Sequence, residues 1–266
     1  MATDDEIVHR RVLNSVAFMI PELALDVTPP EIAQQVYRVV YENTGENDPY
    51  RYAKRRADDL AMSFYPLMKD RVDYSDDPLQ TACKLAIGGN AIDLGAQAEY
   101  SDMNTIIEES LSCALNLEDY KLFKQSITDA SSILYIGDNA GEVVFDRILT
   151  EQILKINSNN IVYVVREKPI INDATIEDTI RVGLDKVVKV ISSGSVAPAT
   201  ILSQCSPEMK SMYNSADVII AKGQGNYESL CNSPENIFFF FKVKCPVIAR
   251  DCGYDIGTLA LISNSS

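Results

Sequence analysis

The sequence predicts an α/β fold in which a Rossmann-like, doubly wound parallel sheet follows an N-terminal all-helical bundle. Two observations predict this class. Up to about residue 128, apolar side chains recur three and four positions apart, which is the spacing of amphipathic helices. From residue 129 onward, short β-rich apolar runs alternate with helical segments, and this order is typical of parallel strands joined by right-handed crossovers. We therefore expect a helical bundle or cap over residues 1–128 and an α/β domain over residues 129–266, with no linker or repeat between them.

Six helical segments are expected in the first half. The second begins at Thr28 with two prolines and ends at Gly45, and these are common start and stop signals of helices. The third continues its periodic pattern up to Pro66, a residue that removes a backbone hydrogen bond from a helix. The expected segments cover residues 4–20, 28–45, 50–66, 77–96, 103–115 and 118–130.

Five strands are expected in the second half, and each is largely apolar along its length, as in a sheet that is buried on both faces. The expected strands cover residues 132–136, 160–165, 187–191, 216–221 and 245–249. Between them, helices are expected over residues 141–155, 174–182 and 206–214. Ligands of an open parallel sheet bind outside the carboxyl ends of its strands. The residues that follow each strand are therefore the candidates for a functional site.

Oxygen-bearing side chains follow the first two expected strands. Asp138 and Asn139 come after the first strand, and Asp173 comes after the second. Carboxylate and amide oxygens suit Mg²⁺ or Mn²⁺ better than Zn²⁺. The chain has one histidine, His9, and its six cysteines form no Cys-x-x-Cys pair, so we expect no metal site built from nitrogen or sulfur. The pattern predicts a divalent metal ion held by oxygen.

A short basic loop is expected after the fourth strand. Lys222 is followed by Gly223 and Gly225, and the backbone N–H groups of such a loop could cradle a phosphate. The formal net charge of -14 disfavours nucleic acid and anionic membranes as partners. A metal ion and a lysine would supply local positive charge, so the combination favours a small phosphorylated substrate. Taken singly, these residues also fit ordinary roles, with Asp173 as a helix cap and the lysine and glycines in turns.

Three functional classes fit this pattern, namely a metal-dependent phosphatase, an S-adenosylmethionine-dependent methyltransferase and a non-enzymatic protein that binds a metal or a phosphometabolite. No apolar run approaches the roughly 20 residues of a membrane span. The acidic first residues differ from a signal peptide, so we expect a cytoplasmic protein. The sequence gives no indication of oligomeric state.

Long segments of the chain resemble one known family. In the second half these segments are "IGDNAGEVVFDR", "VVREKPIINDAT", "SSGSVAPATIL", "ADVIIAKGQGNYESL" and "FFFFKVKCPVIA". In the first half they are "TPPEIAQQVYRVVYENTGENDPY" and "LAIGGNAIDLGA". Together they cover about residues 25–255 and resemble the DUF89 family of damage-control phosphatases, which carry an ARMT1-like metal-binding domain. The chain is most similar to the short stand-alone prokaryotic members.

The resemblance implies a metal-dependent phosphomonoester hydrolase that acts on sugar phosphates or related damaged or side-product metabolites. It implies that the metal, which is Mn²⁺, Co²⁺, Ni²⁺ or Mg²⁺, is held by Asp138, Asn139 and Asp173, and that the two aspartates are catalytic. Further residues are implied in binding the substrate or its phosphate, and these are Asn139, Lys222, Gly223, Lys244, Asn90 and Asp93. In one respect the chain departs from many stand-alone members, because no Cys-x-x-Cys segment stands near its N-terminus.

Overall fold

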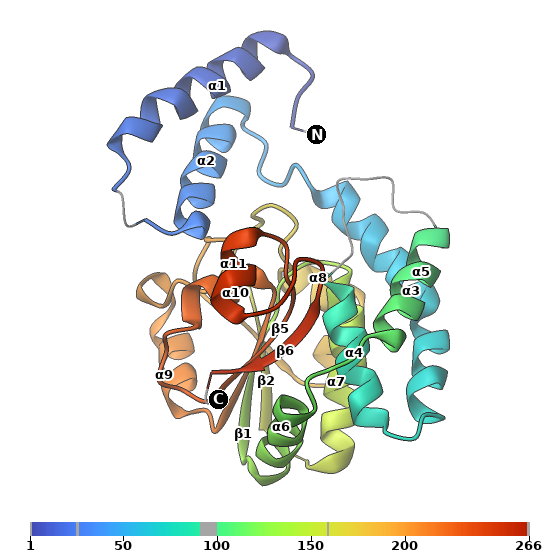
Figure 1. Cartoon of the computed structure of the whole chain (residues 1–266). Coiled ribbons are helices and arrows are strands. Elements are labelled where there is room, and N and C mark those ends of the chain that lie inside the picture. Colours follow the sequence, from blue (N-terminus) through green and yellow to red (C-terminus); the bar gives the residue numbers. More distant parts are fainter. Residues whose placement is uncertain (1, 25–26, 91–99, 159, 265–266) are drawn as a thin grey trace.

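One six-stranded sheet forms the centre of the molecule, and helices cover both of its faces (Figure 1). The structure is a computed structural model that describes residues 2–24, 27–90, 100–158 and 160–264. The strand order is β3-β2-β1-β4-β5-β6, in which β1 to β5 run parallel and β6 runs antiparallel to β5. The chain therefore winds outward in both directions from β1, as the doubly wound class requires. The strands are β1 (Ser132–Ile136), β2 (Asn160–Val165), β3 (Lys189–Ser192), β4 (Val218–Lys222), β5 (Ile237–Lys242) and β6 (Leu259–Ser263).

The helices largely follow the expected segments. The second helix shows the predicted signals, because Thr28 and Glu31 form a capping box and Gly45 ends the helix in a left-handed conformation. In the part of the chain that the structure describes, no helix is both long and apolar enough to cross a membrane. The helices are α1 (Glu6–Met19), α2 (Pro29–Thr44), α3 (Arg51–Asp73), α4 (Pro78–Gly89), α5 (Tyr100–Ser112), α6 (Leu117–Asp129), α7 (Glu142–Ile156), α8 (Ile176–Arg181), α9 (Pro207–Ser215), α10 (Gln224–Leu230) and α11 (Pro246–Cys252).

Both faces of the sheet are buried, and each face has its own hydrophobic core. Strand β5 illustrates the alternation, because Phe238 and Phe240 enter one core whereas Phe239 and Phe241 enter the other. The first core lies between the sheet and helices α3 to α7, and the second lies between the sheet and helices α9, α10 and α11. Burying one such phenylalanine contributes about 1.5–3 kcal/mol. The helical first half thus shares a core with the sheet.

The fifth strand is not where the sequence analysis expected it. Residues 245–249 begin helix α11, with Cys245 at the N-cap and Pro246 at the first helical position. Proline is preorganised for that position but lacks the N–H group that a central strand donates. The helix ends at Gly253, whose φ is +77°. The fifth strand is instead the phenylalanine-rich run Ile237–Lys242, and the antiparallel strand β6 was not expected at all.

The helical half also differs from the expectation in two details. Helix α3 does not stop at Pro66 but continues to Asp73, because Phe64 and Met68 on either side of the proline anchor the helix in the first core. Burial of this face outweighs the local cost of the proline, which is about 3 kcal/mol. Figure 1 further shows that α1 and α2 pack on each other and lie apart from α3, α4 and α5.

Candidate active site

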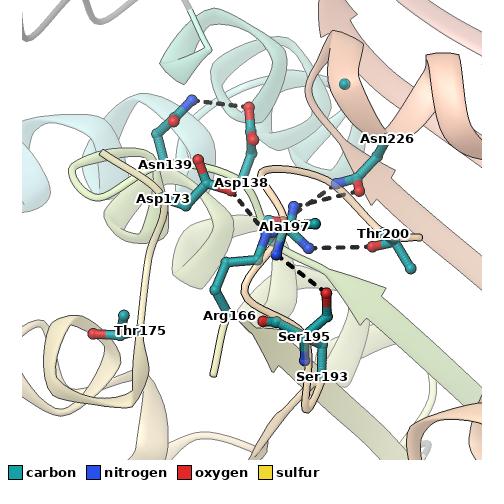
Figure 2. Close-up of polar contacts among 12 residues, drawn as sticks. Asp138, Asn139, Arg166, Asp173, Thr175, Ser193, Ser195, Ala197, Thr200 and Asn226 are labelled. Atoms are coloured by element: carbon teal, nitrogen blue, oxygen red, sulfur yellow. Dashed lines mark hydrogen bonds and ion pairs between the residues drawn. The ribbon is translucent and has the colours of Figure 1, made fainter. Parts of the chain in front are cut away.

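The three predicted metal donors lie together at the carboxyl edge of the sheet. Strands β1 and β2 are neighbours, and the pairing continues beyond their ends, since Asn139 and Asp173 form an isolated antiparallel bridge. The backbone N–H of Ala174 donates to the carbonyl oxygen of Asp138 at 2.8 Å. Figure 2 shows the side chains of Asp138, Asn139 and Asp173 side by side. Two loops that are distant in the sequence therefore bring two carboxylates and one amide to a single point.

The carboxylate of Asp138 is oriented by amide groups from both halves of the chain. Its Oδ2 atom accepts hydrogen bonds from Nδ2 of Asn90 at 3.0 Å and from Nδ2 of Asn139 at 2.8 Å. The same two amides also donate to Oε1 of Glu142, at 2.7 and 2.6 Å. Asn90 is the C-cap residue of α4 and is 1% exposed. The helical half therefore supplies a side chain that contacts Asp138, and the implied role of Asn90 in binding the substrate stays a prediction.

Arg166 orients the second carboxylate. It follows β2 directly and is 2% exposed, and its Nε donates to Oδ2 of Asp173 at 2.8 Å. Its two remaining nitrogens donate to the side chains of Thr200, at 3.2 Å, and Asn226, at 3.4 Å (Figure 2). A planar guanidinium held at three points fixes the position of its partner more firmly than a lysine would. Arg166 thus restricts Asp173 to one orientation.

Lys222 lies behind the donors rather than in a loop at the rim. It is the last residue of β4, is 0% exposed, and its Nζ contacts Asp146 at 2.5 Å and Glu142 at 3.1 Å. Burial alone would lower the pKa of Lys222, but these two carboxylates outweigh it and raise the pKa. Asp146 also accepts from the hydroxyl groups of Tyr135 and Tyr163. The ammonium group of Lys222 is therefore already enclosed by protein carboxylates and does not reach the rim. This position corrects the prediction that Lys222 contacts a phosphate.

Gly223 has a steric role that the sequence analysis did not anticipate. Its φ is +80°, and a Cβ atom added at this position would lie 2.0 Å from Oδ2 of Asp138. Its backbone N–H donates to the carbonyl oxygen of Phe240 as part of the sheet. The N–H group is thus unavailable for the predicted phosphate contact, and the absent side chain instead leaves room for the Asp138 carboxylate.

The donors sit in an environment with excess negative charge. Burial, followed by the nearby charges of Glu142 and Asp173, raises the pKa of Asp138 to about 8. Burial also raises the pKa of Asp173, although Arg166 opposes this shift. Counted together, the acidic groups Asp138, Glu142, Asp146 and Asp173 outnumber the buried basic groups Arg166 and Lys222 by two. A divalent cation would balance that excess, so the charge and the oxygen donors both fit such an ion.

The remaining predicted residues have separate outcomes. Lys244 is exposed, follows β5 rather than preceding a strand, and lies close enough to lower the pKa of Asp138. Its position at the rim is compatible with the predicted phosphate contact. Asp93 lies outside the described residues. Within the described ranges, no group of three or more His, Cys, Asp or Glu side chains is placed to hold a metal, and the predicted donor set itself includes only two.

Sequence reasoning missed Glu142 and Arg166. Glu142 is the last residue of "GDNAGE", and an acidic residue in the first turn of a helix is commonly explained by its favourable interaction with the helix dipole. Arg166 is the first residue after the second strand, and ligands of a parallel sheet bind at such positions. Both side chains are buried, and buried charges need partners, but burial is not evident from the sequence.

A cavity of about 720 Å³ opens between α2 and the loop that follows β2. Tyr37 lines it from α2, and Ile170 and Lys168 line it from the loop. Burial, a hydrogen bond with Tyr50 and the charge of Asp173 all raise the pKa of Tyr37. The cavity has room for a small metabolite, and its lining reaches Ile171, two residues before Asp173, but includes none of the three predicted donors.

The doubly wound sheet, its polar carboxyl edge and the helices that contribute to this edge define an α/β protein with a candidate ligand site at the carboxyl ends of its strands. The chain belongs to the family of the damage-control phosphatase ARMT1-like domain, whose model matches residues 1–259. It is 36% identical over 266 residues to a damage-control phosphatase from Pyrococcus horikoshii, covering 99% of this chain and 92% of that protein. It is 33% identical over 265 residues to a damage-control phosphatase from Archaeoglobus fulgidus, covering 97% and 91% of the two chains.

The fold is likewise similar to a solved structure. A crystal structure of a DUF89 family protein from Pyrococcus horikoshii aligns with a TM-score of 0.91 and 35% identity. The alignment covers 99% of this chain and 92% of that chain. The predicted resemblance and fold class are thereby confirmed.

Proposed function

We propose that this protein is a metal-dependent phosphatase that hydrolyses small phosphorylated metabolites. The observation that carries the proposal is the convergence of Asp138, Asn139 and Asp173 at the carboxyl edge of the sheet. The relatives named damage-control phosphatases support the phosphatase activity. The oxygen donors and the local excess of negative charge support the dependence on a divalent cation.

Each residue of the site has a distinct part in this proposal. Asp138, Asn139 and Asp173 would hold the divalent cation, which supplies positive charge for the phosphoryl oxygens and lowers the pKa of a bound water molecule. Asn90 and Arg166 hold the two carboxylates in place before any ligand binds. Such preorganisation reduces the reorganisation that the transition state requires.

The charged residues around the donors complete the site. Lys222 pairs with both Glu142 and Asp146 and offsets part of their negative charge, which helps them to remain buried beside the donors. Lys244, which is exposed at the rim, would contact the phosphate in this proposal. Its positive charge would attract an anionic substrate to an otherwise acidic protein.

Two nucleophiles are compatible with this arrangement, namely a water molecule and a carboxylate. A carboxylate nucleophile would be Asp138, because it is partly exposed whereas Asp173 is 4% exposed and paired with Arg166. A single turnover in water labelled with heavy oxygen separates the two routes. With a chiral phosphorothioate substrate that carries the other two oxygen isotopes, retention of configuration at phosphorus indicates an aspartyl-phosphate intermediate, and inversion indicates direct attack by water.

The proposal is tested by measuring phosphate release from a panel of sugar phosphates and related metabolites. Activity is expected with Mn²⁺, Co²⁺, Ni²⁺ or Mg²⁺ and is expected to disappear when EDTA removes the metal. Asp138→Ala should abolish this activity while leaving the fold intact. Metal binding without turnover of any phosphorylated metabolite would instead support a binding protein, and equal activity with and without EDTA would refute the metal dependence.

A further inference from the structure

Helix α3 contacts both of the loops that carry the predicted metal donors. Two of its residues, Lys54 and Asp58, are one helical turn apart and therefore lie on the same face of the helix. Lys54 is 2% exposed and Asp58 is 0% exposed. Buried charged residues are rare unless they have a specific partner, so the partners of these two side chains are informative.

Asp58 holds the loop of the first two donors. Its Oδ1 atom accepts a hydrogen bond from the backbone N–H of Gly141 at 2.7 Å. Gly141 stands two residues after Asn139 and has a φ of +81°. A Cβ atom on Gly141 would lie 3.1 Å from Cβ of Ala57, so the glycine allows α3 to approach the loop closely. The turn that carries Asp138 and Asn139 is therefore fixed against α3.

Lys54 holds the loop of the third donor. Its Nζ contacts Oδ2 of Asp178 at 2.9 Å. The same carboxylate oxygen accepts hydrogen bonds from the backbone N–H and the hydroxyl of Thr175, both at 2.7 Å. Thr175 stands two residues after Asp173. Through Asp178, Lys54 thus fixes the segment that carries the third donor.

We propose that Lys54 and Asp58 are positioning residues through which α3 sets the spacing between the two donor loops, so that the helical half is needed for metal binding. This inference rests on the proposed metal site. Its physical basis is that a single rigid helix holds both loops at contacts two to five residues from the donors. By linkage, a metal ion that pulls the two loops together must also stabilise the docking of α3.

The same helix offers matched control residues. Arg55 and Asp59 follow Lys54 and Asp58 directly and also pair with α8, through Glu177 at 2.7 Å and Arg181 at 2.6 Å. The side chains of Arg55 and Asp59 are 48% and 65% exposed. Exposed ion pairs contribute little to stability. These contacts join α3 to α8, as the Lys54–Asp178 contact does, but they do not reach a donor loop.

The test is calorimetric titration of the metal-free full-length chain with Mn²⁺. Asp58→Ala is expected to raise the Kd for Mn²⁺ about tenfold, which corresponds to about 1.4 kcal/mol. Asp58→Asn keeps an oxygen that accepts from Gly141 and should stay within about twofold of the unaltered chain, as should the control Asp59→Ala. In the second pair, Lys54→Gln should weaken Mn²⁺ binding severalfold and Arg55→Gln should not.

Hydrogen exchange of the unaltered chain gives a readout that does not depend on a variant folding. Mn²⁺ is expected to slow exchange of the Gly141 amide and of amides in α3, whereas α9, on the opposite face of the sheet, should not respond. Unchanged exchange in α3, or an Asp58→Ala variant that binds Mn²⁺ like the unaltered chain, would overturn the positioning role while leaving the metal site in place. Absence of Mn²⁺ binding to the unaltered chain would overturn both proposals.

Discussion

Substitution of Gly223 by alanine tests the geometry of the site with a single methyl group. The added Cβ atom would lie 2.0 Å from Oδ2 and 2.4 Å from Cγ of Asp138, whereas Cβ contacts below 3.0 Å are essentially never observed. The carboxylate must therefore shift by about 1 Å or the backbone of β4 must move. Either change disrupts the hydrogen bonds that Oδ2 accepts from Asn90 and Asn139.

The expected loss of stability follows from two contributions. The backbone of Gly223 has φ +80° and ψ 154°, a region almost exclusive to glycine, and forcing alanine into it costs about 1–3 kcal/mol. Weakening two hydrogen bonds to a carboxylate adds about 1–2 kcal/mol. We therefore expect Gly223→Ala to lower the free energy of unfolding by about 2–5 kcal/mol and to weaken Mn²⁺ binding more than tenfold.

Gly253→Ala is the matched control. Gly253 also has a positive φ, +77°, but a Cβ atom added there meets nothing within 4 Å. Its substitution should lower the free energy of unfolding by about 1–2 kcal/mol and leave Mn²⁺ affinity unchanged. Urea unfolding of the metal-free chains and calorimetric titration with Mn²⁺ measure the two quantities. A Gly223→Ala variant with unaltered Mn²⁺ affinity would refute the placement of Asp138 at the metal site.

Three further predictions concern the charged groups around the site. Lys222→Met should lower the free energy of unfolding, measured in urea, by about 3–5 kcal/mol, because it leaves two buried carboxylates without a cation. Lys244→Ala should keep full stability and raise KM. Equal losses of stability would contradict the different burial of the two lysines. Because burial and the charges of Glu142 and Asp173 raise the pKa of Asp138 to about 8, Mn²⁺ binding should release protons at pH 7 and fewer at pH 9. A binding enthalpy at pH 7 that is the same in buffers of different ionisation enthalpy would argue against this. Burial and the charge of Asp178 raise the pKa of Asp58 to about 7. The protonated carboxyl therefore stabilises the metal-free fold at pH 4, and this contribution is lost as the pH rises through 7. The stability of Asp58→Asn, measured by urea unfolding, should lack that part of the pH dependence.

Much of the fold was predictable because β1, β2 and β4 are apolar runs that end in polar loops. The convergence of the donors followed from the same pattern, since the carboxyl ends of neighbouring parallel strands lie together. The role of Lys222 was not predictable, because its partners on α7 are about 80 residues away and become neighbours only when the helix packs on the sheet. The error at residues 245–249 has a local cause, since a short apolar run fits a strand or a buried helix equally well.

Strand β6 has a consequence for how the chain avoids self-association. The run Ile237–Phe241 is uncharged and strongly β-forming, which is the composition of segments that stack into amyloid-like assemblies. β6 pairs with its open edge, and the outward N–H of Ser263 donates to Asp119 on α6. The last strand therefore covers the edge of β5, and a chain cut before Leu259 would leave that edge free to pair with a strand of another chain. During synthesis β5 emerges before β6, so the edge of β5 stays unpaired and prone to aggregation until the chain is complete.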